Sequence, residues 1–430
     1  MKNSTRLISA VAGFVVLVNM SVVSAQNWPQ WRGPMMTGAA PAGNPPTEWS
    51  EQQNIRWKTR LPGKGYSTPA IWGNDIFLTA GISSETGSSS AMSVTYTQPV
   101  KYVVLAVDRT SGKIKWEHVV REEVPHEGQH GTSTWATNSP VTDGERVYFY
   151  FGSQGLYCFT VGGDLLWEKD FGDMNKRMQF GEGSSPVLYK DRLVVNWDHE
   201  GQSFIVALDA VSGEEIWRKN RDEGTTWMTP LIVEVAGKPQ VITSATSKVR
   251  SYNLADGEIV WEDDGLTSNC IPSPVEADGV VYVMSGYRGF ALRAIRLEGA
   301  KGDISGSSSI LWSYDQFTPY TPSPLLLGDK LYFLKTNNGF LTCLNTATGQ
   351  PLYENQRLDD ISGVYSSPVG VQDRVYVLGR DGVTLVLSNG SEYNILAKNT
   401  LDDKFDSSPA IAGDEIFLRG YQFLYCIARQ

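Results

Sequence analysis

The sequence predicts an all-β fold, an eight-bladed β-propeller of four-stranded antiparallel blades whose ring is closed by the N-terminal strand. Three observations lead to this prediction. A Ser/Thr-Pro marker recurs along most of the 430 residues, a glycine turn is followed at a fixed distance by an aromatic residue, and the last repeat lacks one strand. Short alternating apolar runs bounded by polar turns, such as 146–151, are typical of strands, and no segment shows a sustained helical period.

The proline marker divides the chain into repeats. Each marker proline follows a Ser or Thr and precedes a short strand. After a first interval of 71 residues, the spacing lies between 41 and 50 residues, which is the period of one propeller blade. Eight markers therefore predict eight blades. The markers are Pro69, Pro140, Pro186, Pro230, Pro274, Pro324, Pro368 and Pro409.

A glycine and an aromatic residue four positions later mark the second half of most repeats. The fifth repeat reaches Trp312 through a longer insertion over 299–309, and the seventh has no matching aromatic. We expect these aromatic residues to pack between blades and assign them no ligand role. The pairs are Gly112 and Trp116, Gly163 and Trp167, Gly213 and Trp217, Gly257 and Trp261, and Gly349 and Tyr353.

The two ends of the repeat region complement each other. The last repeat stops after the strand-like run 423–427 and lacks its fourth strand, whereas the segment 54–61, which carries Trp57, matches that missing strand. Pairing the two would close the ring and remove an open sheet edge. The propeller is therefore predicted to span 54–430.

The first 25 residues resemble a secretory signal peptide. Lys2 and Arg6 form a positive end, 7–18 is an apolar run, and small residues at 23–25 precede Gln26. The run is short for a transmembrane helix, which needs about 20 apolar residues, and no cysteine for lipid attachment lies near the cleavage point. We expect a periplasmic or secreted protein without stable membrane insertion; an uncleaved anchor is the alternative.

Residues 26–53 are rich in Trp, Pro and Gly, which favours an extended segment over a helix or a central strand. Trp28 and Trp31 are expected to pin this segment to the propeller, and a ligand role for them is the alternative.

Charge and cysteine content limit the function classes. The formal net charge of −10 opposes nucleic acid or an anionic membrane as a partner, and we expect a monomer. The four cysteines form no CxxC pair and no haem motif. Buried strand thiols are expected, and a single disulfide between blades is the alternative. The cysteines are Cys158, Cys270, Cys343 and Cys426.

The Ser-x-Pro start, the strand 207–209 (Ala-Leu-Asp) and the Gly-x-x-x-Trp close resemble the PQQ-like, or quinoprotein-type, β-propeller repeat over 54–430. The opening Trp-Pro-Gln-Trp-Arg-Gly-Pro at 28–34 is similar to that of exported bacterial members. The superfamily contains PQQ-dependent alcohol dehydrogenases and non-catalytic relatives such as the outer-membrane assembly factor BamB.

The resemblance implies a test of enzyme function. The dehydrogenases hold PQQ between a Trp and a disulfide of adjacent cysteines, with a calcium ion on Glu, Asn and Asp ligands and a catalytic Asp. This chain has no adjacent cysteines, and no such acidic set can be mapped onto it. We therefore expect a BamB-like, non-catalytic, exported platform for binding or protein assembly in the cell envelope, without a cofactor. A dehydrogenase using PQQ and calcium and a carbohydrate-binding propeller are the alternatives.

Residues before each marker proline should crowd one mouth of the central channel. Aromatic residues occur there in nearly every repeat, with polar neighbours. Aromatic walls with a few polar groups suit a small or extended ligand, such as a small molecule or a polymer; the alternative is that they only fill the funnel. The predicted ligand-binding residues are Tyr66, His130, Trp135, Asn138, Glu182, Trp227, Asn269, Tyr320, Tyr365 and Asp406.

Two of the four histidines, His126 and His130, lie close together in a Gly- and Pro-containing stretch. The glycine and proline residues of this stretch are unfavourable for a helix, so the two histidines are not expected on one. A metal site would need a third ligand such as Glu127 or Glu182. We expect a hydrogen-bonded loop there and no metal.

Overall fold

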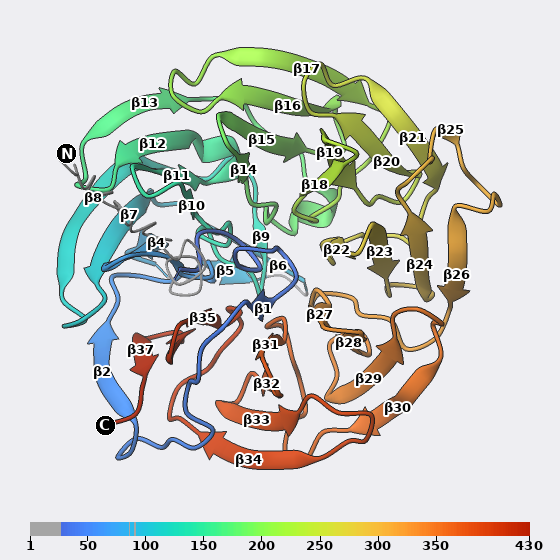
Figure 1. Ribbon diagram of the computed structural model, residues 1–430. Coiled ribbons are helices and arrows are strands. Elements are labelled where there is room, and N and C mark those ends of the chain that lie inside the picture. The colour runs from blue at the N-terminus through green and yellow to red at the C-terminus, as the bar shows by residue number, and fades with distance from the viewer. Residues whose placement is uncertain (1–26, 86, 90–91) are drawn as a thin grey trace, which may run out of the picture.

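The computed structural model describes residues 27–85, 87–89 and 92–430, so the expected signal peptide over 1–25 lies outside the described residues. The strands form eight small antiparallel sheets around a central axis, which confirms the predicted eight-bladed propeller (Figure 1). The first strand of each blade is the innermost. Buried apolar clusters join neighbouring blades, so the core lies between the sheets.

Each blade follows its marker proline. The first four blades, in chain order, consist of β3 (Ala70–Trp72), β4 (Asp75–Ser83), β7 (Val100–Asp108) and β8 (Ile114–Glu123); β10 (Val141–Thr142), β11 (Arg146–Tyr150), β12 (Leu156–Thr160) and β13 (Leu165–Lys169); β14 (Val187–Tyr189), β15 (Arg192–Trp197), β16 (Ser203–Asp209) and β17 (Glu215–Arg221); and β18 (Leu231–Val235), β19 (Lys238–Thr243), β20 (Lys248–Asn253) and β21 (Ile259–Asp264).

The last four blades continue the same order. They consist of β22 (Val275–Ala277), β23 (Val280–Ser285), β24 (Ala291–Arg296) and β26 (Ile310–Tyr314); β27 (Leu325–Leu327), β28 (Lys330–Leu334), β29 (Phe340–Asn345) and β30 (Pro351–Arg357); β31 (Val369–Val371), β32 (Arg374–Leu378), β33 (Val383–Ser388) and β34 (Ile395–Thr400); and β35 (Ala410–Ala412), β36 (Glu415–Arg419), β37 (Phe423–Ile427) and β2 (Ile55–Arg60).

The ring closes as predicted. β2 pairs antiparallel with β37, with Trp57 opposite Cys426, and so supplies the outermost strand of blade eight. Within the described ranges, no helix has both the length and the apolar composition that a membrane crossing requires. The four cysteines are buried free thiols, and burial raises the pKa of each to about 12. Cys270 lies in a loop rather than in the expected strand.

Tryptophans on outermost strands join neighbouring blades. The Nε1 of Trp57 donates to the carbonyl oxygen of Arg109 at 2.9 Å, and its ring lies against Gly112 of blade one. Trp167 repeats this contact against Gly213, whose φ is +74° and whose added Cβ would lie 2.8 Å from the ring. The glycine turn and the tryptophan of the repeat therefore meet across blades rather than within one.

We expect Gly213→Ala to lower the free energy of unfolding by about 2 to 3 kcal/mol. Of this, the left-handed backbone costs about 1 kcal/mol and the clash with Trp167 the remainder. Gly237→Ala is the matched control, because Gly237 has a φ of +75° but an added Cβ there would meet nothing within 4 Å. Equal losses for the two variants in urea unfolding would contradict the packing role.

A belt of hydrogen bonds explains the Ser or Thr before each marker proline. The backbone N–H of Ser139 donates to the Oγ of Ser185 at 2.8 Å, and the same step leads from blade to blade around the channel. Inner strands of neighbouring blades do not pair as a ladder, so these hydroxyls satisfy their buried N–H groups. The other steps join Thr68 to Ser139, Ser185 to Thr229, Thr229 to Ser273, Ser273 to Ser323, Ser323 to Ser367, and Ser367 to Ser408.

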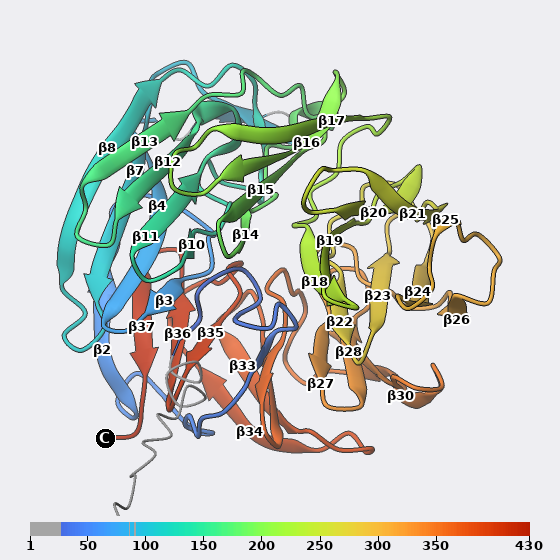
Figure 2. The same cartoon turned by 45° about the horizontal axis from the view of Figure 1, so that its top comes forward.

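The N-terminal segment crosses the centre of the ring, as Figures 1 and 2 show in dark blue. Trp28 is fully buried and exchanges two backbone hydrogen bonds with Ile71 of blade one. Farther along, β1 (Ala39–Ala40) pairs parallel with β31 of blade seven. Between them, the buried Arg32 donates to the carbonyl oxygens of Pro324 and Pro368 at 2.6 and 2.8 Å. Trp28 thus pins the segment as expected, and the segment spans the channel.

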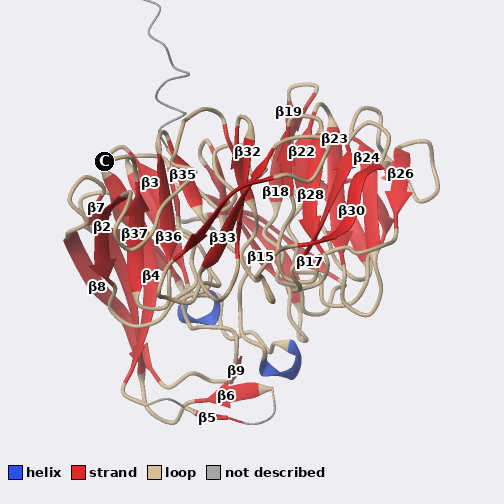
Figure 3. Ribbon diagram, turned by 90° about the horizontal axis from the view of Figure 1, so that it is seen from below, coloured by secondary structure: helices blue, strands red, loops and turns tan. Residues whose placement is uncertain are grey.

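Two additions to the blades do not follow from the repeat. In the insertion over 299–309, β25 (Gly302–Asp303) pairs parallel with β21 and gives blade four a fifth strand. A small sheet of β5 (Ser88–Ser89), β6 (Ser93–Thr95) and β9 (Gln129–His130) projects from one face of the ring (Figure 3). The 3-10 helices η1 (Gly152–Gln154) and η2 (Arg177–Gln179) lie on the same side. We call this side the mouth face.

Candidate functional site

A cavity of about 200 Å³ lies on the propeller axis, beside the hydroxyl belt. We call it the central cavity. Its walls come from the segments that precede the marker prolines, as predicted. Seven of the ten predicted residues line it: Tyr66, His130, Glu182, Trp227, Tyr320, Tyr365 and Asp406.

The other three predicted residues do not line the cavity. Trp135 packs edge-on against Tyr96, with ring centroids 5.8 Å apart. Asn138 is buried and donates through Nδ2 to the carbonyl oxygen of Ser184 at 2.6 Å. Asn269 is buried too, with a φ of +57°. These three therefore lie outside the lining, because a position before the proline does not decide whether a side chain points to the axis or into the blades.

Several lining residues are not among the ten predicted ligand-binding residues. The indole of Trp31 belongs to the segment across the channel and donates through Nε1 to the Oγ of Ser273 at 3.1 Å. Phe180 and the belt hydroxyls also line the cavity. The recurring Ser or Thr before each proline was a usable signal for the belt, whereas nothing in the repeat placed Trp31 at the axis.

One wall carries a paired charge. Arg380 donates to both carboxylate oxygens of Asp406 at 2.6 and 2.9 Å, and the hydroxyl of Tyr421 donates to the same carboxylate at 2.6 Å. The guanidinium lies 4.2 Å from the ring centroid of Tyr365. Burial, reinforced by Tyr421 and Asp406, raises the pKa of Tyr66 far above its usual value. This wall therefore offers aromatic faces and neutral phenols.

The wall from blades two to four contains His130, Trp227 and the carboxyl group of Glu182. The backbone N–H of Thr132 donates to Nδ1 of His130 at 3.1 Å, which leaves the proton of the neutral ring on Nε2. Burial and then Arg380 lower the pKa of His130. Trp227 donates through Nε1 to the carbonyl oxygen of Gly181 at 2.7 Å. The side chain of Trp227 thus has a fixed orientation in the wall.

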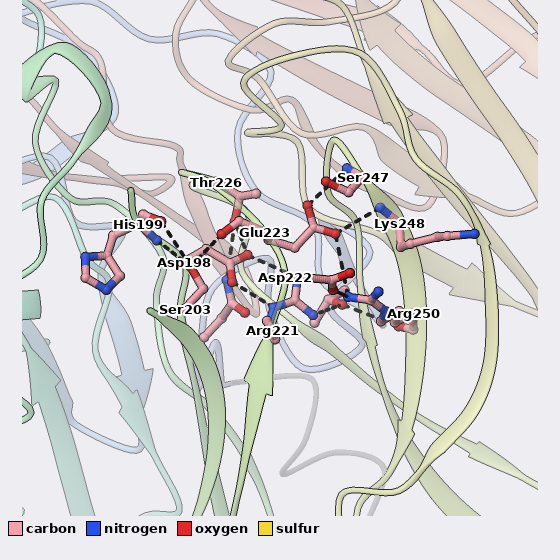
Figure 4. A network of polar contacts seen from close by, with 12 residues as sticks. Asp198, His199, Ser203, Arg221, Asp222, Glu223, Thr226, Ser247, Lys248 and Arg250 are labelled. Carbon is pink, nitrogen blue, oxygen red and sulfur yellow. Dashed lines mark hydrogen bonds and ion pairs between the residues drawn. The ribbon is translucent and has the colours of Figure 1, made fainter. Parts of the chain in front are cut away.

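A fully buried ion pair holds the loop that carries Trp227 (Figure 4). Arg221 donates to both oxygens of Asp198 at 2.7 and 3.1 Å, and both side chains are 0% exposed. The hydroxyl of Thr226, next to Trp227, donates to the same carboxylate at 2.7 Å. Glu223, in the same loop, accepts from the backbone N–H groups of Ser247 and Lys248, at the start of β20. This network connects blades three and four behind the cavity wall.

Three potential metal ligands meet beside the cavity. Ligand atoms of His126, Glu127 and Glu182 lie within 4.8 Å of one another. Burial raises the pKa of Glu127 to about 7, and burial raises that of Glu182 as well. Glu127 and Glu182, which the sequence suggested as possible third ligands, are thus both in this group. His130, by contrast, lies at the cavity rather than in this group.

The lining does not fit PQQ with calcium. PQQ carries three carboxylates, and no Lys or Arg occurs among the described lining residues. The two lining carboxylates, Glu182 and Asp406, come from the segments before blades three and eight, which are not neighbours in the ring. Asp406 is already paired with Arg380. The donor set is therefore not that of the quinoprotein dehydrogenases.

Comparison with known proteins gives sequence matches of one kind. A family model described as outer membrane protein assembly factor BamB matches residues 47–194, 100–351 and 201–430. The outer membrane protein assembly factor BamB of Francisella tularensis subsp. tularensis is 26% identical over 204 residues, and that of Francisella salina is 25% identical over 174 residues. These matches cover 47% and 40% of this chain. The chain spans less than half of each relative, 40% and 30%.

Solved structures share the fold. BamB from Moraxella catarrhalis superposes with a TM-score of 0.61 at 14% identity, covering 86% of this chain and 98% of that one. A europium-containing methanol dehydrogenase superposes with a TM-score of 0.66 at 10% identity, covering 94% and 92%. At these sequence identities the similarity establishes the propeller fold alone. The function has to be argued from the site.

Proposed function

Because the chain belongs to the family of the outer membrane protein assembly factor BamB, we propose that it is a non-catalytic, exported platform for protein binding or assembly in the cell envelope. We further propose that the central cavity on the mouth face receives a side chain from an extended segment of a partner protein. The BamB relatives support the assembly role, and their envelope association supports a periplasmic location.

The size and chemistry of the central cavity are the observation that carries this proposal. Its volume of about 200 Å³ is below the roughly 300 to 1,000 Å³ of typical small-molecule pockets. Aromatic faces such as those of Tyr320 and Tyr365, with the belt hydroxyls beneath, suit an apolar side chain flanked by backbone polar groups. One inserted residue with its neighbours on the mouth face fits this space better than a sugar chain or a whole cofactor.

Photo-crosslinking in the exporting cell tests the proposal. A benzophenone amino acid is placed at Tyr365 in the cavity and, as the matched control, at Leu396, which is exposed on the outermost strand β34. We expect an adduct with a discrete envelope protein at position 365 and little at position 396. Equal adducts at both positions, or none at 365, would contradict the use of the cavity.

Native mass spectrometry with PQQ and calcium tests the non-catalytic part. We expect no stoichiometric adduct on the purified protein, because the lining offers no Lys or Arg among its described residues to the three carboxylates of PQQ. A stable one-to-one adduct, together with dye-linked oxidation of an alcohol or sugar, would replace the platform by a dehydrogenase.

A further inference from the structure

We propose that His126, Glu127 and Glu182 form a binding site for one zinc ion at the edge of the central cavity. The three side chains come from two separate loops, the bend between β8 and β9 and the loop that follows η2. Their ligand atoms already lie within 4.8 Å of one another. Ligands about 2.1 Å from a tetrahedral zinc lie about 3.4 Å apart, so small side-chain rotations would complete the site.

The histidine is oriented as a ligand. Nε2 of His126 lies 2.7 Å from the carbonyl oxygen of Met174. A carbonyl oxygen only accepts, so Nε2 carries the proton and Nδ1 of the neutral ring keeps its lone pair. Metal-bound histidines frequently donate their other ring N–H to a backbone carbonyl. The Nδ1 atom is therefore free to bind the ion.

The carboxylates are positioned by hydrogen bonds from η1 and from the segment between β13 and η2. The backbone N–H and hydroxyl of Ser153 donate to the two oxygens of Glu182 at 2.7 and 2.5 Å, and the N–H of Met174 donates to that hydroxyl at 2.8 Å. The N–H of Lys176 donates to Glu127 at 3.1 Å. Each carboxylate oxygen has two acceptor sites, so these bonds leave room for a metal.

A close backbone approach supports the position of Glu182. Gly152, at the start of η1, has a φ of +63°, and an added Cβ there would lie 1.3 Å from Oε2 of Glu182. Any residue other than glycine at this position would displace the carboxylate of Glu182. The nearby ammonium of Lys176 donates instead to the carbonyl oxygens of Asp198 and Thr226 at 2.7 and 2.9 Å.

The ligand set favours zinc over calcium. One imidazole and two carboxylates are typical donors for zinc and related divalent transition ions, whereas calcium takes six to eight oxygens. Glu182 also lines the central cavity, so a fourth coordination position would face a bound partner. Asp173 is a further carboxylate beside the site, with its Oδ1 3.8 Å from Nδ1 of His126.

Zinc binding to the purified, chelator-treated protein tests the site by isothermal titration calorimetry. We expect one equivalent with micromolar or tighter affinity, and a loss of at least about 10-fold in His126→Ala and in Glu182→Gln. Cobalt should give the visible absorption of a tetrahedral ion in the wild type only. Ser153→Ala, which removes a positioning hydroxyl, should weaken binding by roughly 10-fold.

The control variant is His118→Ala, which removes an exposed histidine of β8 and should leave zinc affinity unchanged. Circular dichroism in chelator checks the folding of each variant, and Glu127→Gln replaces any variant that fails to fold. No binding by the wild type, or unchanged affinity in the ligand variants, would overturn the site. Because the measurement needs no partner, its failure would leave the proposed function standing.

Discussion

Asp198→Asn is expected to lower the free energy of unfolding by about 3 to 5 kcal/mol, the usual cost of breaking a fully buried ion pair. The substitution leaves the guanidinium of Arg221 without its charge partner, and both side chains are 0% exposed. The hydroxyl of Thr226 also loses its anionic acceptor. Urea unfolding followed by tryptophan fluorescence measures the effect.

The control for this prediction is Asp191→Asn. Asp191 also pairs with an arginine, Arg192 at 2.7 Å, but its side chain is 63% exposed, so the loss should stay below about 1 kcal/mol. Similar losses in both variants would mean that burial of the pair between Asp198 and Arg221 does not matter.

The effect of Asp198→Asn should depend on pH. Burial alone would raise the pKa of Asp198, but the charge and hydrogen bonds of Arg221, with those of Asn196 and Thr226, outweigh it and the pKa is lowered. A lowered pKa stabilises the fold above the unfolded value of about 3.9 and loses this contribution as the pH falls through the folded value. The difference between wild type and variant should therefore shrink below about pH 4.

Trp227→Ala and Tyr365→Ala should each weaken binding of the protein crosslinked at position 365 by roughly 30-fold or more. Aromatic residues in the centre of an interface cost about 2 kcal/mol or more when truncated. Calorimetry with the purified partner measures the affinity. Both Trp227→Ala and Trp227→Phe remove the hydrogen bond from Nε1 to the carbonyl oxygen of Gly181. Trp227→Phe keeps an aromatic face in the wall, so it should weaken binding less.

Tyr189→Ala serves as the matched control. Tyr189 is the last residue of β14, whereas the belt residue Ser185 lies before the start of that strand. The side chain of Tyr189 is half-buried, and its hydroxyl donates to Glu234 at 2.7 Å. Affinity should be unchanged in this variant. A melting temperature that falls steeply in Tyr365→Ala, with no folded protein left to bind, would instead make that ring structural.

Features that repeat could be predicted from the sequence. The eight proline markers specified eight inner strands, and the unmatched strand around Trp57 specified the closure with β37. Repeated sequence features predict structure here because neighbouring blades pack through the same contact. A turn glycine of one blade lies against the tryptophan of the preceding blade, as Gly213 does against Trp167.

Features that depend on side-chain direction or on non-repeating segments could not be predicted. Trp135 and Trp227 occupy similar positions before a marker proline, yet only Trp227 lines the cavity. The path of the N-terminal segment, which brings Trp31 to the axis, is decided by contacts with distant blades such as that of Arg32 with Pro324. Long-range contacts of this kind leave no local pattern in the sequence.

Hydrogen exchange of the complex with the crosslinked partner tests the use of the central cavity most directly. Binding should slow exchange in mouth-face segments that carry lining residues, such as 130–137 and 318–323, and leave exchange in the outermost strand β34 unchanged. Protection confined to the outermost strands, with none at the mouth, would contradict the use of the central cavity and place the partner on the rim of the propeller.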